Sequence, residues 1–548
     1  MATPDDIKAA ESIVGVAYTD RERLQILEVL ESQLLATKAR REVTLSNSVP
    51  MALRFDPRLP GFQMPADGTP HRSKPQTALP DSDEDIAFAH LPELSSWIEA
   101  GVLSSERITS IYLKRIEALD PDLNCFATVT PDIALTQARA MDALLRQGRY
   151  LGPLHGIPYG LKDLFDTAGV ETAWGAEAFR GRVPDQDATI VGKLRDAGAV
   201  LLGKTALGAL AYGDLWYGGQ TRNPWNIEEG SSGSSAGSAA ATAAGLCAFS
   251  IGTETLGSIT SPSERCGATG LRPTFGRVSR HGAMALCWSL DKVGPICRGV
   301  EDTALVLDAI NGPDVRDPSS IPSSFTIDAS SPISGIRIGY LPIAYAEGAT
   351  DCDRKALDVV KSLGMSVVEI ELPDLPYDAL MNIVYAEAAA AFEDLTLSGR
   401  DDLLSWQAFD AWPNIFRTAR FLSAVDHVQL DRLRYLVMEA LDTAFNEVDV
   451  IVGPFSTGPM LVASNFTGHP CLHIRAGFED LPSRTQGSLL DQERSEHGPA
   501  PEMHHVPRGL SLWAGLFDEQ RLISVGLALE AALKIADVRP VISERAGQ

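Results

Sequence analysis

A run of small residues between Gly230 and Gly276 constrains the fold of this chain more than any other feature. The run opens with the glycine and serine residues of 230–235 and continues as an almost pure Ala/Gly/Ser/Thr segment over 236–246. Small residues let a backbone turn tightly and approach its neighbours, and alanine favours helix. The pattern predicts a tight turn, a closely packed helix, a short buried strand over 248–252 and a second tight turn over 253–258.

Three other interpretations of this run are weaker. A flexible Gly/Ser linker would not lead into an apolar helix and strand and then into a second Gly-Ser turn. A phosphate-binding P-loop needs a closing Gly-Lys-[Ser/Thr], which is absent. Gly233–Gly237 matches the G-x-S-x-G nucleophile elbow with Ser235 at its centre, but a Ser/Gly-rich run produces such a match by chance.

The long composite pattern resembles the signature of the amidase signature family. The corresponding runs are Gly233–Ala241, Glu254–Thr260 and Gly270–Ser279, and the resemblance continues through Trp288–Pro295. It covers about residues 86–537, with a weaker middle. The resemblance implies an α/β fold, in which a single large domain has a central mixed β-sheet covered by helices.

A lysine ends an apolar segment well before the serine run. Residues 152–162 read as a strand that ends in Lys162, and burying an ammonium group is costly. One interpretation is a buried lysine paired with Asp163 or Asp166. The resemblance instead implies that Lys162 is a catalytic base, that Ser234 is a bridging serine held by a cis peptide, and that Ser258 is the nucleophile.

The chemistry of this triad depends on charge. A free lysine has a pKa of about 10.4, and burial favours its neutral form. We therefore expect activity to rise toward alkaline pH as Lys162 loses its proton. Ser235 is expected to support the network by hydrogen bonds. Backbone N–H groups of the second turn would form the oxyanion hole, which comprises Thr255, Leu256, Gly257 and Ser258.

Several positions near the second turn bear on the substrate. Leu256 stands where the family has glycine, so the turn must keep an ordinary backbone angle there, and its side chain is expected to narrow the pocket. Glu254 stands in place of the usual aspartate. Thr260 stands where many members carry an arginine that holds a carboxylate, which favours a neutral substrate. Tyr212 and Tyr217 are candidate pocket walls, although core packing explains them equally well.

The leading functional hypothesis is an amidase that hydrolyses the C–N bond of a small neutral amide, anilide or carbamate-like substrate, in the manner of a urethanase. An acyl-serine intermediate would also give side esterase activity. The alternative is the glutamine-hydrolysing component of a tRNA-dependent amidotransferase, which needs partner proteins. A third hypothesis, a non-catalytic scaffold, is disfavoured because Lys162, Ser234 and Ser258 are all present.

Composition narrows the remaining classes. A formal net charge of −25 argues against binding to nucleic acid or to an anionic membrane. The seven cysteines are scattered through apolar contexts without a C-x-x-C motif, which indicates reduced thiols in a cytoplasmic protein. No signal peptide, membrane span, metal or cofactor is expected.

The chain is expected to divide at about residue 85. Residues 1–85 read as a helical N-terminal extension followed by a wrapped connector rich in Pro, Gly, Asp and Ser. The helices should pack on the main body or on a second copy of the chain, which would make a homodimer. Residues 86–540 form the signature domain, with a variable, mostly helical cover at about 340–448. Residues 480–507 read as an exposed acidic loop.

Overall fold

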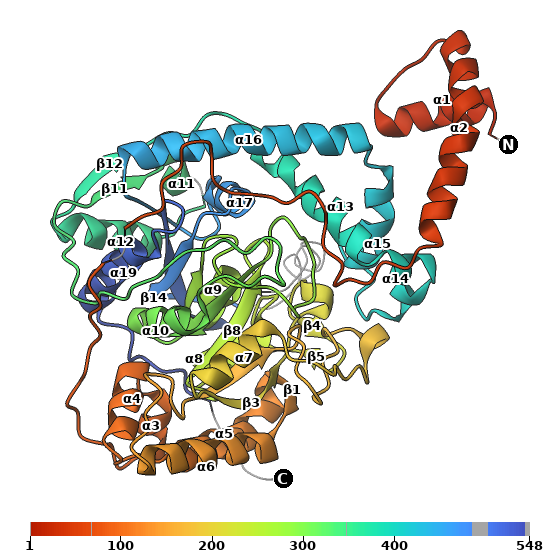
Figure 1. The fold of residues 1–548 in the computed structure, drawn as a ribbon. Helices are drawn as coiled ribbons and strands as arrows, with labels where there is room; N and C mark the ends of the chain where they lie inside the picture. Colours follow the sequence, from red (N-terminus) through yellow and green to blue (C-terminus); the bar gives the residue numbers. More distant parts are fainter. Residues whose placement is uncertain (1, 67, 347, 485–501, 543–548) are drawn as a thin grey trace.

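A mixed β-sheet crosses the centre of the molecule (Figure 1). The computed structural model describes residues 2–66, 68–346, 348–484 and 502–542. Eleven strands of the described chain form this sheet, in the order β1 (Phe126–Val129), β3 (Val200–Thr205), β2 (Pro158–Lys162), β8 (Phe249–Glu254), β10 (Lys292–Cys297), β9 (Thr269–Arg272), β14 (Cys471–Pro482), β15 (Met503–Ala514), β13 (Val450–Gly453), β11 (Arg337–Tyr340) and β12 (Ser366–Glu369). The predicted α/β fold with a central mixed sheet is confirmed.

The strand directions bring two predicted site segments to one edge of the sheet. β2 runs parallel to both β3 and β8, with Leu161 opposite Ile251 in the register. Every residue of β2 and β8 is buried, as expected for strands covered on both faces. Since the carboxyl ends of neighbouring parallel strands meet at the same edge, Lys162 at the end of β2 comes close to Thr253 at the end of β8.

Helices cover both faces of the sheet, and most of them lie in the signature domain (Figure 1). In the first half of that domain they are α3 (Asp83–Phe88), α4 (Leu91–Glu99), α5 (Ser105–Leu123), α6 (Pro131–Arg146), α7 (Thr189–Asp196), α8 (Ala236–Ala243), α9 (Thr260–Cys266) and α10 (Val300–Ile310). All eight residues of α8 are buried, because its small side chains let it pack directly against β2, β8 and β10.

The second half of the domain carries the helical cover and ends in a closing helix. Its helices are α11 (Pro342–Ala346), α12 (Asp351–Ser362), α13 (Met381–Ala391), α14 (Glu393–Leu397), α15 (Trp412–Thr418), α16 (Ala424–Glu447), α17 (Met460–Phe466) and α19 (Glu519–Leu533). Figure 1 shows α13 to α16 lying across one side of the sheet. Short two-stranded sheets, β4 (Leu215–Trp216) with β5 (Gly219–Gln220) and β6 (Arg222–Asn223) with β7 (Asn226–Gly230), lead into the serine run.

The expectation of one long exposed loop over 480–507 was wrong at both of its ends. β14 and β15 extend as a hairpin in which Asp480 pairs with His505 and Pro482 with Met503. The imidazole Nδ1 of His505 lies 2.8 Å from the Asp480 carboxylate. Cross-strand pairing therefore outweighs the loop-like composition of these residues, and the centre of the segment, 485–501, lies outside the described residues.

The N-terminal extension forms the predicted pair of helices, α1 (Pro4–Val14) and α2 (Asp20–Arg41), which stand away from the body in Figure 1. Leu24 and Leu35 on α2 are 59% and 60% exposed, so α2 does not pack along the body. Its last turn is tied to the body by an ion pair, in which Arg40 lies 2.6 Å from Glu393. Among the described residues, no helix has the length and apolar character needed to span a membrane.

Candidate active site

Lys162 is completely buried and is surrounded by hydroxyl groups. Its Nζ lies 2.8 Å from Ser234 Oγ, 3.0 Å from Ser235 Oγ and 2.9 Å from Thr253 Oγ1. The two carboxylates considered as its partners bind elsewhere: Asp163 lies 3.3 Å from the buried Lys204, and Asp166 lies 2.7 Å from Arg182. Lys162 is therefore a buried amine without an ion-pair partner among the described residues.

Burial controls the charge of Lys162. Removal from water lowers its pKa well below the ordinary lysine value, and the nearby carboxylates of Asp291 and Glu254 only partly oppose this effect. A neutral amine has a lone pair, so it can accept a proton from a hydroxyl in contact with it. Ser234 is the hydroxyl closest to Nζ.

The three serines of the site differ in exposure. Ser234 and Ser235 are almost fully buried, whereas Ser258 is 8% exposed and its hydroxyl makes no hydrogen bond to any described residue. The backbone N–H of Ser235 donates to the carbonyl of Ser258 at 3.1 Å, which holds the two serine turns together. The structure thus brings Lys162, Ser234 and Ser235 into contact and places Ser258 beside them.

The turn that carries Ser234 has an unusual backbone. The Gly233–Ser234 peptide is cis, as the family resemblance implied. A Cβ at Gly233 would clash with the carbonyl of Gly213, so only glycine fits this position. Asp214 anchors the preceding residue, because its carboxylate accepts the N–H of Ser232 at 3.0 Å.

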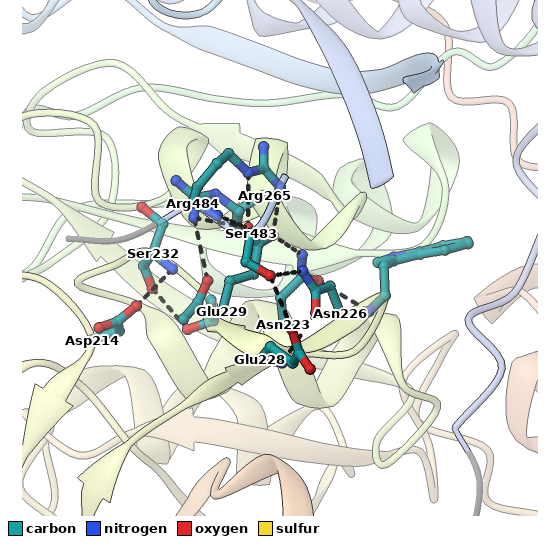
Figure 2. Close-up of polar contacts among 12 residues, drawn as sticks. Asp214, Asn223, Asn226, Glu228, Glu229, Ser232, Arg265, Ser483 and Arg484 are labelled. Carbon is teal, nitrogen blue, oxygen red and sulfur yellow. Dashed lines mark hydrogen bonds and ion pairs between the residues drawn. The ribbon is translucent and has the colours of Figure 1, made fainter. Parts of the chain in front are cut away.

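A polar cluster at the end of β7 supports the same turn (Figure 2). The fully buried Glu229 carboxylate accepts the Arg484 guanidinium at 2.6 Å and also the Arg484 backbone N–H. Arg265 of α9 lies 3.8 Å from the same carboxylate, and Asn223 donates to it at 2.7 Å. Although burial opposes this effect, the arginines lower the pKa of Glu229. Through its contacts with Arg484, Arg265 and Asn223, this one carboxylate links β7, α9 and the residues after β14.

The turn after β8 presents backbone donors. The four predicted oxyanion-hole residues are Thr255, Leu256, Gly257 and Ser258, and their N–H groups have no hydrogen-bond acceptor in the described part of the chain. Gly257 has a φ of +80°, whereas Leu256 keeps an ordinary negative φ, as expected for a residue with a side chain. Unpaired N–H groups beside a free serine hydroxyl are the arrangement that an oxyanion hole requires.

The carboxylate of Glu254 binds the residues that follow this turn. Its Oε2 accepts the N–H groups of Ile259 and Thr260 at 2.9 and 3.0 Å, and its Oε1 lies 2.7 Å from the buried Arg272. Burial alone would raise the pKa of Glu254, but the charge and hydrogen bond of Arg272, the charge of Lys292 and the N–H of Thr260 together lower the pKa to about 2. A further hydrogen bond fixes the start of the turn, because the Thr255 hydroxyl donates to the Asp291 carboxylate at 2.6 Å.

A cavity of about 470 Å³ reaches Thr253, a contact of Lys162, and is also lined by Thr255 and Ala211. Lys162, Ser234 and Ser258 do not themselves line it. The predicted pocket residues Tyr212, Tyr217, Leu256 and Thr260 are not among the residues that line it. The Thr260 hydroxyl donates to Glu254 at 3.1 Å, Tyr212 stacks between Trp406 and Trp412, and Tyr217 packs on Trp216. These contacts give each of the three side chains a role in packing or support, and their assignment to the substrate pocket, like that of Leu256, stays a prediction.

The connector supplies cavity walls that no motif indicated. Residues within 47–55 line this cavity together with Trp288 and Lys292 of the body. Lys292 is another buried lysine, and burial together with the charge of Arg272 lowers its pKa to about 7. Thr253, the third hydroxyl on Lys162, was also missed, although its place at the end of a strand beside Lys162 could have indicated it. In the described ranges, no three His, Cys, Asp or Glu side chains are arranged to hold a metal ion.

Comparison with known sequences gives one family and a consistent set of relatives. The family model described as Amidase matches residues 107–522. A glutamyl-tRNA(Gln) amidotransferase subunit of Halorhodospira halophila is 36% identical over 466 residues, covering 79% of this chain and 95% of that protein. The protein of the same name from Bdellovibrio bacteriovorus is 32% identical over 495 residues, covering 83% of this chain and 99% of that protein.

Solved structures with similar folds are amidases and a catabolic enzyme complex. The peptide amidase of Stenotrophomonas maltophilia is 31% identical, with a TM-score of 0.70, and the match covers 84% of this chain and 99% of that one. A vestigial protein complex related to an s-triazine catabolic enzyme gives 28% identity and a TM-score of 0.71, over 81% of this chain and 98% of that one.

Proposed function

Because the chain belongs to the amidase signature family, we propose that it is an amide hydrolase in which Lys162, Ser234 and Ser258 carry the reaction. One observation carries this proposal. The buried Nζ of Lys162, which lacks a carboxylate partner in the described chain, lies 2.8 Å from the hydroxyl of Ser234. A serine hydroxyl is a weak nucleophile until a base takes its proton, and a neutral lysine can act as that base.

In this proposal the proton moves along two hydroxyls. Ser234 passes its proton to Lys162 and takes the proton of Ser258, whose oxygen attacks the amide carbonyl. The N–H groups of Leu256, Gly257 and Ser258 stabilise the negative charge on the carbonyl oxygen. The intermediate breaks its C–N bond, the amine leaves with the proton returned through Ser234, and water then hydrolyses the acyl-Ser258 ester by the same route.

Two substrate classes compete for this site. The names of the relatives support glutamine, which would make the protein the glutamine-hydrolysing component of a tRNA-dependent amidotransferase. A small neutral amide, anilide or carbamate is supported by Thr260, whose hydroxyl is engaged with Glu254 and which offers no charge to a substrate carboxylate. The similarity to a peptide amidase agrees with hydrolysis of an amide. The relatives' names favour the glutamine candidate more directly.

The proposal also includes a reducing, cytoplasmic location. All seven cysteines are described, buried and unpaired, which agrees with a compartment that keeps thiols reduced.

A fluorophosphonate label tests the catalytic assignment. The parent should be labelled on Ser258, and Ser258→Ala should abolish the label. Lys162→Ala and Ser234→Ala should slow labelling by at least about 10³-fold, because residues that act as a unit lose most of their effect together. Ser12→Ala on the exposed helix α1 is the control and should label like the parent.

Substrate panels distinguish the two classes. Turnover of glutamine alone, and only when partner proteins are supplied, would select the amidotransferase component. Turnover of anilides, primary amides or carbamates by the isolated chain would select the amidase. An unlabelled parent that turns over none of these substrates would contradict the proposal as a whole.

A further inference from the structure

The connector between α2 and the body lines two cavities, the first of which reaches Thr253, a contact of Lys162. Asn47, Pro50 and Met51 line the cavity that reaches Thr253, and they also line a second cavity of about 630 Å³. On the side of the body, Trp288 lines both cavities. The connector and Trp288 therefore form a shared wall between the cavity that reaches Thr253 and its neighbour.

Specific contacts fix the connector in this position. Asn47 pairs with the backbone of Ala285 in both directions, because its Nδ2 donates to the carbonyl at 2.7 Å and its Oδ1 accepts the N–H at 2.8 Å. At one end Arg40 holds Glu393 with two hydrogen bonds, at 2.6 and 2.8 Å. At the other end Phe55 packs edge-on against Phe275. The segment is thus tied to the body on both sides of the shared wall.

The second cavity has aromatic side chains in its walls. Trp174 contacts Phe179 with ring centroids 4.6 Å apart, and Phe392 lies 6.5 Å from the same ring. Two ring nitrogens in these walls, Trp174 Nε1 and His427 Nδ1, are buried without a hydrogen-bond partner in the described chain. Such a chamber suits an apolar, uncharged group that carries a hydrogen-bonding atom.

Two of the carboxylates around this chamber, Glu387 and Glu393, are already engaged by the protein. Glu387 accepts the N–H and the hydroxyl of Ser289, at 3.0 and 2.5 Å. Glu393 is held by Arg40 and Arg420. The lining residues Arg41, Asp394 and Arg400 make no ion pair among the described residues, but they are exposed to solvent, whereas Trp174 and Phe392 are buried. The buried part of the chamber therefore offers aromatic rings to an apolar group.

We propose that the connector is a specificity element of the active site, in which Met51 and Asn47 close the aromatic chamber over the apolar, uncharged part of the substrate. This inference rests on the amide hydrolysis proposed above, and it deepens it by naming the class of group that is bound. The N-terminal extension, outside the family match at 107–522, then belongs to the pocket.

Two fluorophosphonates of different size test the proposal in the full-length chain. One carries a methyl group and the other a bulky naphthyl group. The measured quantity is the labelling rate with the bulky probe divided by the rate with the small probe. Met51→Ala should raise this ratio by about tenfold and Met51→Trp should lower it by a similar factor, because a change in side-chain size in an apolar pocket typically changes discrimination by about that much. Met64→Ala is the matched control, since Met64 is on the same connector but lines neither cavity.

Labelling of Ser258 in the parent tests the hydrolase function, and the ratio of the two labelling rates tests the connector. If neither probe labels Ser258 in the parent, the proposed hydrolase function fails. If the parent is labelled but the ratio in both Met51 variants stays within about twofold of the parent, the connector proposal is overturned and the hydrolase function stands. Equal loss of both labels in a variant that melts like the parent would also overturn it, because Met51 would then act on catalysis and not on size.

Discussion

Replacing Glu254 by glutamine tests whether one buried carboxylate organises the turn of the nucleophile. In the parent, this carboxylate accepts Arg272 and Asn465 on one oxygen and two backbone N–H groups on the other. Glutamine keeps the size but offers one acceptor oxygen and an NH₂ group. Whichever way the amide is oriented, its NH₂ faces hydrogen-bond donors, and Arg272 loses its counter-charge.

The magnitude follows from the ion pair and from the pKa. Both side chains are fully buried, and removing one partner of a buried pair costs about 3–5 kcal/mol. Independently, lowering the pKa of Glu254 from 4.5 to about 2 corresponds to about 3 kcal/mol of stability, at about 1.4 kcal/mol per pH unit. We therefore expect Glu254→Gln to lower the free energy of unfolding by about 3–5 kcal/mol at pH 7.

The pH dependence gives a second signature. Because the folded state lowers this pKa, the stabilisation is complete above about pH 4.5 and is lost as the pH falls toward 2. Urea unfolding of parent and variant at several pH values should show the difference shrinking in that window. Glu371→Gln, at an exposed position, should change stability by less than about 0.5 kcal/mol. A Glu254→Gln protein within about 1 kcal/mol of the parent at pH 7 would refute the reasoning.

Three further outcomes are expected. Since burial lowers the pKa of Lys162, kcat/KM should rise with pH and reach its plateau well below about pH 10.4, and a rise that continues to the pKa of a free lysine would contradict a buried base. The exposed Leu24 and Leu35 on α2 lead us to expect a homodimer. Changing both leucines to aspartate should yield monomers in analytical ultracentrifugation. A parent protein that is already monomeric at micromolar concentration would exclude the homodimer. Arg484→Ala should lower stability by about 1–3 kcal/mol, because the buried Glu229 loses its closest cation, and an unchanged melting temperature would argue against that role.

Much of the catalytic arrangement was predictable because it depends on local patterns. The small-residue helix after Ser235 and the tight turn before Ser258 follow from residue size and from backbone freedom. The resemblance to a known signature then supplied the partnership with Lys162, which lies far earlier in the chain, and the structure places its Nζ 2.8 Å from Ser234. No periodicity or spacing alone could have paired these side chains.

The substrate pocket was not predictable from the same patterns. Tyr212 is a reasonable candidate, since aromatic residues often line pockets, but only the tertiary structure shows that its ring contacts Trp406 and Trp412. Asn47 and Met51 carry no motif, and they reach the site only because the connector is folded back over the body. Side chains that are distant in sequence meet through tertiary contacts, which a local pattern does not encode.

The amino-acid sequence by itself determined the two serine turns and the presence of a lysine at a strand end, because these depend on residue size, polarity and backbone preference, and its resemblance to a known family implied the α/β fold. Only the tertiary structure decided that Lys162 is surrounded by hydroxyl groups with its neighbouring carboxylates engaged by Lys204 and Arg182, and that the connector walls the cavity. The physical reason is that the charge state of a buried amine and the shape of a pocket depend on which groups surround them, and those groups come from separate parts of the chain.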